Sequence, residues 1–398
     1  MENPTHLISK YRITSIDLYR GIIMIIMALD HVRDYFHADS FHFDPQDLSK
    51  TNILLFITRW ITNLCAPTFV LLAGTSAFLS GQKKSKSELS VFLLKRGLWL
   101  IFLELSIVTL GWTFNPSFPV LELGPIWALG IGMVFLSIFI YLPINWMVIL
   151  GLIIVFGHNL LDKIQVPGNN LPGLIWSLIH VQEDFHFGKE IFSLGYPAVP
   201  WIGLMPLGYA LGTLYTKRFD PEKRKKILLY LGLGNLALFL IIRGINHYGD
   251  PSPWSIQNNP SFTLLSYIKV TKYPPSLLYL LITLSPGFIF LAISEDLKGK
   301  TVNFLSVYGR VPMFYYLIHI YLIHILAMLA SGLFTPLGFK AWILPKPLWM
   351  GPSLPGYGFS LGIVYLVWIF VVIALYPLCV RYDAYKQNHK DHWWLGYI

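Results

Sequence analysis

The chain has 398 residues, of which 55% are hydrophobic and only 13% are charged. Soluble domains usually carry about 25% charged residues, so this composition excludes an ordinary soluble enzyme. The formal net charge is +9, but the basic residues form short clusters between long apolar blocks, so we do not expect nucleic-acid binding.

Apolar blocks that approach the roughly 20 residues of a membrane-spanning helix recur along the whole chain. Helices are expected because an open strand edge would leave backbone groups unpaired in lipid. We therefore predict an all-α integral membrane protein, a bundle of about ten transmembrane helices that forms a single transmembrane domain over residues 1–398. The predicted spans are 16–37, 55–81, 92–113, 124–143, 145–161, 196–216, 227–243, 274–293, 308–331 and 359–380.

Lysine and arginine residues predict the orientation of these spans. If the N-terminus is cytoplasmic, the strongly basic segments, including Lys10, Arg12 and the cluster within 83–96, all fall on the cytoplasmic side. Both termini are then cytoplasmic, and the long loops face away from the cytosol: 38–52, 162–195, 244–273 and 332–358. The first apolar block has no small-residue cleavage site after it, so we expect a retained span.

The first span, 16–37, carries the most informative group of ionisable residues. On a helix of 3.6 residues per turn, one stripe contains Asp17, Arg20, Met24, Met27, His31 and Asp34. Arg20 and His31 are eleven residues apart, which places them on one face about 16 Å apart along the axis. Charged groups in a span are costly and usually face a bundle interior or a water-filled cavity.

Two interpretations of this stripe stay open. Asp17 and Arg20 have the spacing of an ion pair and mark the cytoplasmic boundary in the simpler one. Asp30 and His37 share an adjacent face, and Asp30 also precedes His31. A carboxylate beside an imidazole is typical of a general base, because it fixes the tautomer and raises the basicity of the ring.

The same residues resemble a known family. The segments R-I-T-S-I-D-L-Y-R-G (12–21) and D-H-V-R-D-Y-F-H (30–37) are similar to the first span of bacterial relatives of heparan-α-glucosaminide N-acetyltransferase. Arg20 and His31 also fit the Arg-x10-His signature of the wider transmembrane acyltransferase superfamily. Further similar segments lie at 66–79, 124–131, 196–203, 271–277, 309–324 and 393–398.

The resemblance implies a membrane bundle that takes acetyl-CoA from the cytosol and acetylates an acceptor, an amino sugar or glycan, on the far side. It implies an essential histidine just beyond the outer end of the first span, where His37 is the first candidate and His42 the second. The lysosomal enzyme has Asn at the position of Asp30, so we expect the two acid–base networks to differ.

Roles follow from these expectations. We expect His37, supported by Asp30 or Asp34, to be the base, and His31 to be a second base or an acyl relay. Direct transfer and a covalent acyl-histidine both stay open. The predicted donor contacts are Arg20, Asp17, Asn63 and His319.

Weaker signals carry structural alternatives. Glu104 is expected to pair with a nearby cation, and Lys269 and Lys272 either bind an acidic acceptor or reach the interface. Gly208 and Gly212 have the spacing of a close helix contact or a subunit seam, so a homodimer is an open alternative.

No metal site is expected, because His319 and His324 are five residues apart and point in different directions round a helix. Arg59 is expected either to donate to the thioester carbonyl or to anchor the outer interface.

The leading hypothesis is an acyl-CoA-dependent N- or O-acetyltransferase of a bacterial inner membrane, surrounded by lipid. Its main rival is a proton-coupled transporter that uses Asp30, His31 and Arg20 as a relay, and a third alternative gives these residues only a packing role. The absence of an internal repeat weakens a transporter built from inverted halves.

Overall fold

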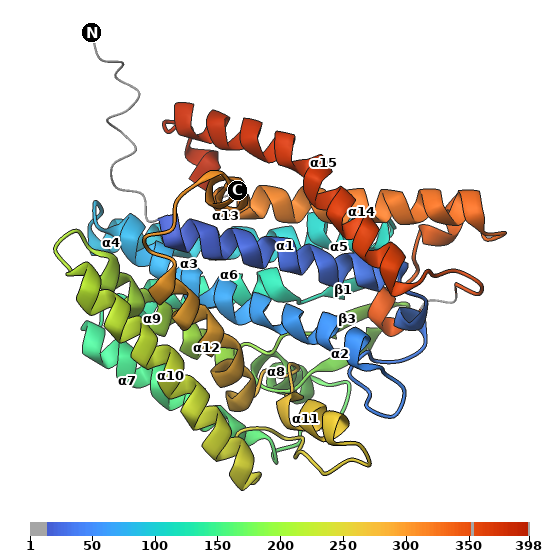
Figure 1. Ribbon diagram of the computed structural model, residues 1–398, viewed down its shortest axis with the longest axis horizontal. Helices are drawn as coiled ribbons and strands as arrows, with labels where there is room; N and C mark the ends of the chain where they lie inside the picture. The colour runs from blue at the N-terminus through green and yellow to red at the C-terminus, as the bar shows by residue number, and fades with distance from the viewer. Residues whose placement is uncertain (1–13, 352–353, 397–398) are drawn as a thin grey trace.

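The computed structural model of the protein describes residues 14–351 and 354–396. The chain is mostly helical, and each predicted span contains at least one helix (Figure 1). Lys10, Arg12 and the last two residues of the 393–398 segment lie outside the described residues. The α-helices are α1 (Thr14–Phe36), α2 (Ile53–Trp60), α3 (Cys65–Gly81), α4 (Lys86–Leu103), α5 (Thr109–Thr113), α6 (Pro125–Phe139), α7 (Ile144–Gly157), α8 (Leu171–Ile179), α9 (Val199–Leu211), α10 (Pro221–Ile245), α11 (Pro260–Ile268), α12 (Leu277–Ile293), α13 (Lys300–Arg310), α14 (Pro312–Phe334) and α15 (Leu361–Asn388).

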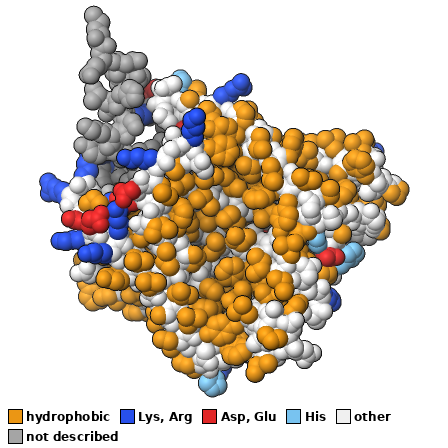
Figure 2. All heavy atoms as spheres, viewed as in Figure 1, with side chains coloured by type: hydrophobic (Ala, Val, Ile, Leu, Met, Phe, Trp, Pro, Cys, Tyr) orange, Lys and Arg blue, Asp and Glu red, His pale blue; other side chains and the backbone are white. Residues whose placement is uncertain are grey.

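The protein is an integral membrane protein by the length and composition of its helices. Five segments of the described chain are long and apolar enough to cross a membrane: Ile53–Gly81, Ile144–Leu161, Pro221–Ile245, Pro312–Phe334 and Leu361–Asn388. Helices α6 and α12 are also apolar but shorter. Figure 2 shows hydrophobic side chains over most of one face, with Lys, Arg, Asp and Glu gathered mainly at its left edge. The count of ten spans and the cytoplasmic termini stay predictions.

The structure breaks the predicted span 308–331 between two helices and adds a small sheet. The range 308–331 is not one helix, because α13 ends at Arg310 and Pro312 starts α14. Proline is well suited to a first helical turn, where its missing N–H costs nothing, but it interrupts a continuing helix.

The expectation of an all-α chain missed three strands, β1 (Val120–Glu122), β2 (Glu183–Phe187) and β3 (Glu190–Leu194). Strand β3 lies in the centre, parallel to β1 and antiparallel to β2. Gly188 turns the β2–β3 hairpin with a φ of +66°, a conformation that favours glycine.

Helix α1 packs against α3, α13, α14 and α15, so its polar stripe is surrounded by protein rather than lipid (Figure 1). Its closest neighbour is α13. A Cβ atom at Gly21 would lie 1.9 Å from the carbonyl oxygen of Leu305, and one at Gly309 would lie 1.9 Å from that of Asp17. The two backbones therefore touch, and only glycine fits at these two positions.

Helices α3 and α9 form a second close contact. A Cβ atom at Gly208 would lie 2.1 Å from the carbonyl oxygen of Leu71, and one at Gly212 would lie 2.7 Å from the Cβ of Phe78. The Thr75 hydroxyl donates to the Gly208 carbonyl over 2.9 Å. This glycine pair is thus a helix seam within the chain, and it gives no support to a subunit seam.

Candidate functional site

A cavity of about 890 Å³ follows α1 through the bundle. Five residues of the predicted stripe line it: Arg20, Met24, Met27, His31 and Asp34. Asp17, the sixth, is not among the lining residues, and its carboxylate lies 3.6 Å from the Arg20 guanidinium. Arg20 and Asp34 are separated by about 21 Å of helix at 1.5 Å per residue. We name the two ends of the cavity the Arg20 end and the Asp34 end.

The Arg20 end is basic. Four basic residues line it: Arg20, Arg96, Arg310 and Lys386. Arg20 donates through Nη1 to the Gly309 carbonyl over 3.0 Å and through Nη2 to the Ser76 hydroxyl over 2.9 Å. Because these bonds fix the orientation of the guanidinium, this end is suited to an anionic ligand.

The Asp34 end mixes charges of both signs. Arg33 is buried, and its Nη2 lies 2.8 Å from the Asp30 carboxylate and 2.5 Å from that of Asp34. The second oxygen of Asp30 lies 3.9 Å from Nη1 of Arg59. One arginine therefore holds both carboxylates in place, and a second arginine compensates Asp30 further.

Asn63 positions Arg59 and does not reach the cavity. Its side-chain oxygen accepts from Arg59 Nη1 over 3.0 Å, and its backbone carbonyl accepts from the Tyr279 hydroxyl over 2.9 Å. Arg59 lines the cavity, whereas Asn63 is fully buried outside the lining. Arg59 therefore lies at the site itself, and the predicted donor contact of Asn63 has no direct counterpart in this geometry.

His31 and His319 form a directed pair. Nδ1 of His31 lies 2.7 Å from Nε2 of His319, whose own Nδ1 lies 2.9 Å from the Tyr315 carbonyl. A carbonyl can only accept, so with both rings neutral His319 carries its proton on Nδ1 and accepts from His31. The proton of His31 is then on Nδ1, and Nε2 keeps a lone pair with no hydrogen bond to the described residues.

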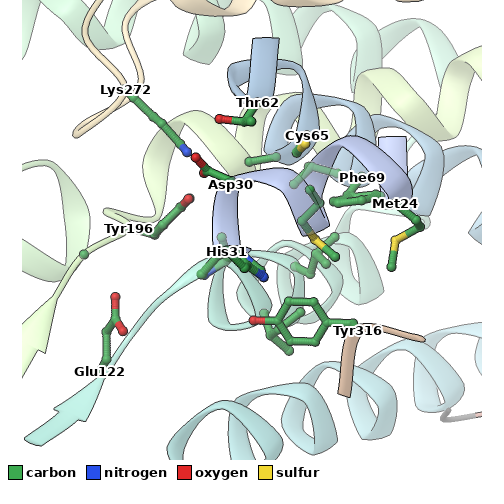
Figure 3. Close-up of a pocket in the computed structure, with 18 of the residues that line it drawn as sticks. Met24, Asp30, His31, Thr62, Cys65, Phe69, Glu122, Tyr196, Lys272 and Tyr316 are labelled. Atoms are coloured by element: carbon green, nitrogen blue, oxygen red, sulfur yellow. The ribbon is translucent and has the colours of Figure 1, made fainter. Parts of the chain in front are cut away.

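This arrangement gives His31 the geometry of a general base. His31 lines the cavity, while His319 is fully buried behind it. His319 thus contacts His31 in place of the donor contact predicted for it. Figure 3 shows His31 on α1, with Tyr316 on the neighbouring wall and the side chains of Asp30, Lys272 and Tyr196 converging above it.

The two other candidate histidines differ in their access to the cavity. His37 follows the last residue of α1, is buried, and accepts from the Asp39 backbone N–H through Nδ1 over 3.3 Å. It is not among the lining residues, whereas the exposed His42 is. The structure therefore brings His31, His42, Asp30 and Asp34 to the cavity and leaves His37 behind its wall.

Two carboxyl groups have surroundings that the sequence did not reveal. Glu104 accepts from the backbone N–H of Trp127 over 2.8 Å, so it caps the start of α6 in place of the cation pair that we expected.

Glu122, on β1, lines the cavity. Burial raises the pKa of the Glu122 carboxyl well above its usual value, and the nearby Glu104 and Asp184 raise it further. The only sign of Glu122 in the sequence was its position as a carboxylate just before the apolar span 124–143.

The sequence matches the family model described as "Heparan-alpha-glucosaminide N-acetyltransferase, catalytic" over residues 12–243. This range is more than half of the 398 residues and runs from the first motif to the last turn of α10. It includes Arg20, Asp30 and His31, whereas the similar segments after residue 243 lie outside it. No curated protein matches the chain.

Proposed function

The chain belongs to the family of the heparan-α-glucosaminide N-acetyltransferase catalytic domain, and from this premise we propose a complete reaction for it. The protein moves an acetyl group from cytosolic acetyl-CoA to an amine or hydroxyl of a sugar-like acceptor on the opposite side of the membrane. One observation carries the proposal: a single cavity joins the basic Arg20 end to the imidazole of His31 and the Asp34 end.

The Arg20 end is proposed to hold the donor. Acetyl-CoA carries several negatively charged phosphate groups. An arginine guanidinium can donate two parallel hydrogen bonds to two oxygens of one phosphate. The predicted orientation places the start of α1 at the cytosol, where acetyl-CoA is found. The acetyl thioester then extends along the Met24 and Met27 part of the cavity toward His31.

His31 is proposed as the base for direct transfer. Its Nε2 takes the proton of the acceptor amine or hydroxyl as the acceptor atom bonds to the thioester carbon. The C–S bond then breaks, and CoA leaves as a thiolate that keeps the electron pair of this bond and then takes up a proton. His319 is a positioning residue here, since it holds the tautomer that leaves Nε2 free.

His37 and a two-step route are the competing proposals. His37 matches the histidine that the family resemblance implies, and it lies one helical turn beyond Arg33, whose carbonyl accepts its backbone N–H.

In the two-step route, Nε2 of His31 attacks the thioester itself and passes the acetyl group on. That route releases CoA once per protein without any acceptor, whereas direct transfer does not.

The test uses purified full-length protein with acetyl-CoA. We expect acetyl-CoA binding, and CoA release that glucosamine accelerates, with release lost in His31→Ala. Neither binding nor release across a broad panel of amine and hydroxyl acceptors would reject the proposal. Acetyl-CoA-independent movement of a solute across proteoliposomes would instead favour the transporter, which no observation so far supports.

A further inference from the structure

Lys272 is a buried cation at the Asp34 end, and the proposed reaction gives it no role. It lies just before α12, is 9% exposed, and lines the cavity. Its ammonium group lies 5.2 Å from the centroid of the Tyr273 ring. Within the described part of the chain this group makes no side-chain hydrogen bond and no direct ion pair, and its charge acts on the Asp30 carboxylate from a longer distance. Figure 3 shows it extending into the cavity toward Asp30.

The carboxylates nearby are already compensated. Asp30 has Arg33 at 2.8 Å and Arg59 at 3.9 Å, and Asp34 has Arg33 at 2.5 Å. Lys272 is therefore not needed to neutralise these two groups. The three cations Arg33, Arg59 and Lys272 outnumber the carboxylates of Asp30 and Asp34, so a negative group that enters the cavity beside Lys272 would balance the excess charge.

We infer that Lys272 binds an anionic group of the acceptor, so that the substrate is an acidic amine, such as an amino sugar that carries a carboxylate, sulfate or phosphate. This inference rests on the proposed function, because it assigns the acceptor to the Asp34 end of the cavity. Lys272 is assigned a substrate contact and no proton transfer.

The charges around the site orient such an acceptor. An ammonium group is repelled by Lys272, whereas Asp30 and Asp34 offer it hydrogen-bond acceptors on the same helix as His31. The anionic group has the opposite preference. An acceptor with both groups thus places its amine beside the proposed base and its anion beside Lys272, which is the order that transfer requires.

The experiment compares acceptors that differ only in charge: glucosamine, glucosamine 6-phosphate, glucosamine 6-sulfate and glucosaminuronic acid. For the wild-type protein we expect one of the three anionic sugars to have a kcat/KM at least about tenfold above glucosamine, and the preferred one identifies the anion. Lys272→Met should lower kcat/KM for the preferred anionic sugar by about tenfold or more relative to glucosamine in the same variant, and so remove this preference. Lys272→Arg should keep most of it.

Lys269→Met is the matched control, because Lys269 lies three residues earlier and does not line the cavity. It should keep the wild-type preference, and both variants should keep the wild-type affinity for acetyl-CoA. Equal losses on charged and neutral acceptors would give Lys272 a structural role and overturn the inference. A raised KM for acetyl-CoA in Lys272→Met would assign Lys272 to the donor site. A wild-type protein that does not prefer any anionic sugar over glucosamine would also overturn the inference.

A second readout separates this inference from the proposed function. Thermal unfolding of the purified protein is followed with the same four sugars and no acetyl-CoA. Stabilisation by an anionic sugar that is lost in Lys272→Met supports the inference even when no acetyl transfer is detected. Transfer to glucosamine, with no sugar-specific stabilisation and no charge preference, would leave the acetyltransferase standing and remove the Lys272 site.

Discussion

The two ends of the cavity hold their cations differently. At the Arg20 end, Arg20 donates to a backbone carbonyl over 3.0 Å and to a hydroxyl over 2.9 Å, while the Asp17 carboxylate lies farther away at 3.6 Å. At the Asp34 end, Arg33 is clamped between two carboxylates. The first arrangement suits a ligand of permanent negative charge, whereas the second places two carboxyl groups beside an imidazole. This difference supports the proposed division of the cavity into a binding end for the donor and a chemical end for the transfer.

The largest expected effect breaks the chemical end. Replacing His31 by Ala removes the free Nε2, so we expect kcat to fall about 100- to 10 000-fold, the range typical of a lost general base. The affinity for acetyl-CoA should stay within a few-fold of wild type. CoA release in the presence of acceptor and equilibrium binding of acetyl-CoA are the two measurements.

His37→Ala is the partner experiment, since His37 lies behind the wall of the cavity. Under the His31 proposal it retains transfer within about tenfold of wild type, well short of the full loss of a general base. Complete loss in His37→Ala with activity preserved in His31→Ala would reverse the assignment of the base.

The binding end is tested by Arg20→Met, which keeps an apolar side chain and removes the guanidinium. Loss of a charge-assisted contact of about 1.5–3 kcal/mol should weaken acetyl-CoA binding roughly ten- to a hundredfold. S-acetylpantetheine, which has no phosphate, is the control ligand, and its affinity should be the same in both proteins. An unchanged affinity for acetyl-CoA would remove Arg20 from the donor site.

The smallest effect concerns Glu122 at the Asp34 end. Burial raises the pKa of this carboxyl in the folded state above the ordinary value of 4.5, so the folded protein holds a proton that the unfolded chain releases. The Glu122 contribution to stability is therefore present below pH 4.5 and is lost as the pH rises toward the folded-state pKa. We expect Glu122→Gln to unfold at a higher temperature than wild type at pH 8, with a smaller difference at pH 5. A difference that does not depend on pH would contradict this expectation.

The arrangement of α1 could be predicted from sequence because it depends on local geometry. Arg20, Met24, Met27, His31 and Asp34 recur at helical spacing, and all five line the cavity. The helical spans were predictable for the same reason, since length and hydropathy are properties of a continuous segment. The β2–β3 hairpin also had a local signal, the alternation of E-D-F-H-F and E-I-F-S-L around Gly188. A prediction based on long apolar segments does not detect such short strands.

The partners of these residues could not be predicted in the same way. His31 and His319 are separated by 288 positions, and no spacing rule connects two different helices. Asn63 and His319 were predicted as donor contacts, and in the structure they contact Arg59 and His31, which line the cavity. Whether a buried polar residue touches a ligand or supports the residue that does depends on side-chain packing, which a single sequence does not contain.

The contact between Gly21 and Gly309 has a mechanical consequence for entry into the cavity. Backbones that already touch cannot approach further, and the Arg20 bond to the Gly309 carbonyl ties the same two helices together. We therefore expect α1 and α13 to move together, as one wall beside the Arg20 end. We expect any widening of that mouth for the proposed donor to come from α4 and α15, which contribute the long side chains of Arg96 and Lys386.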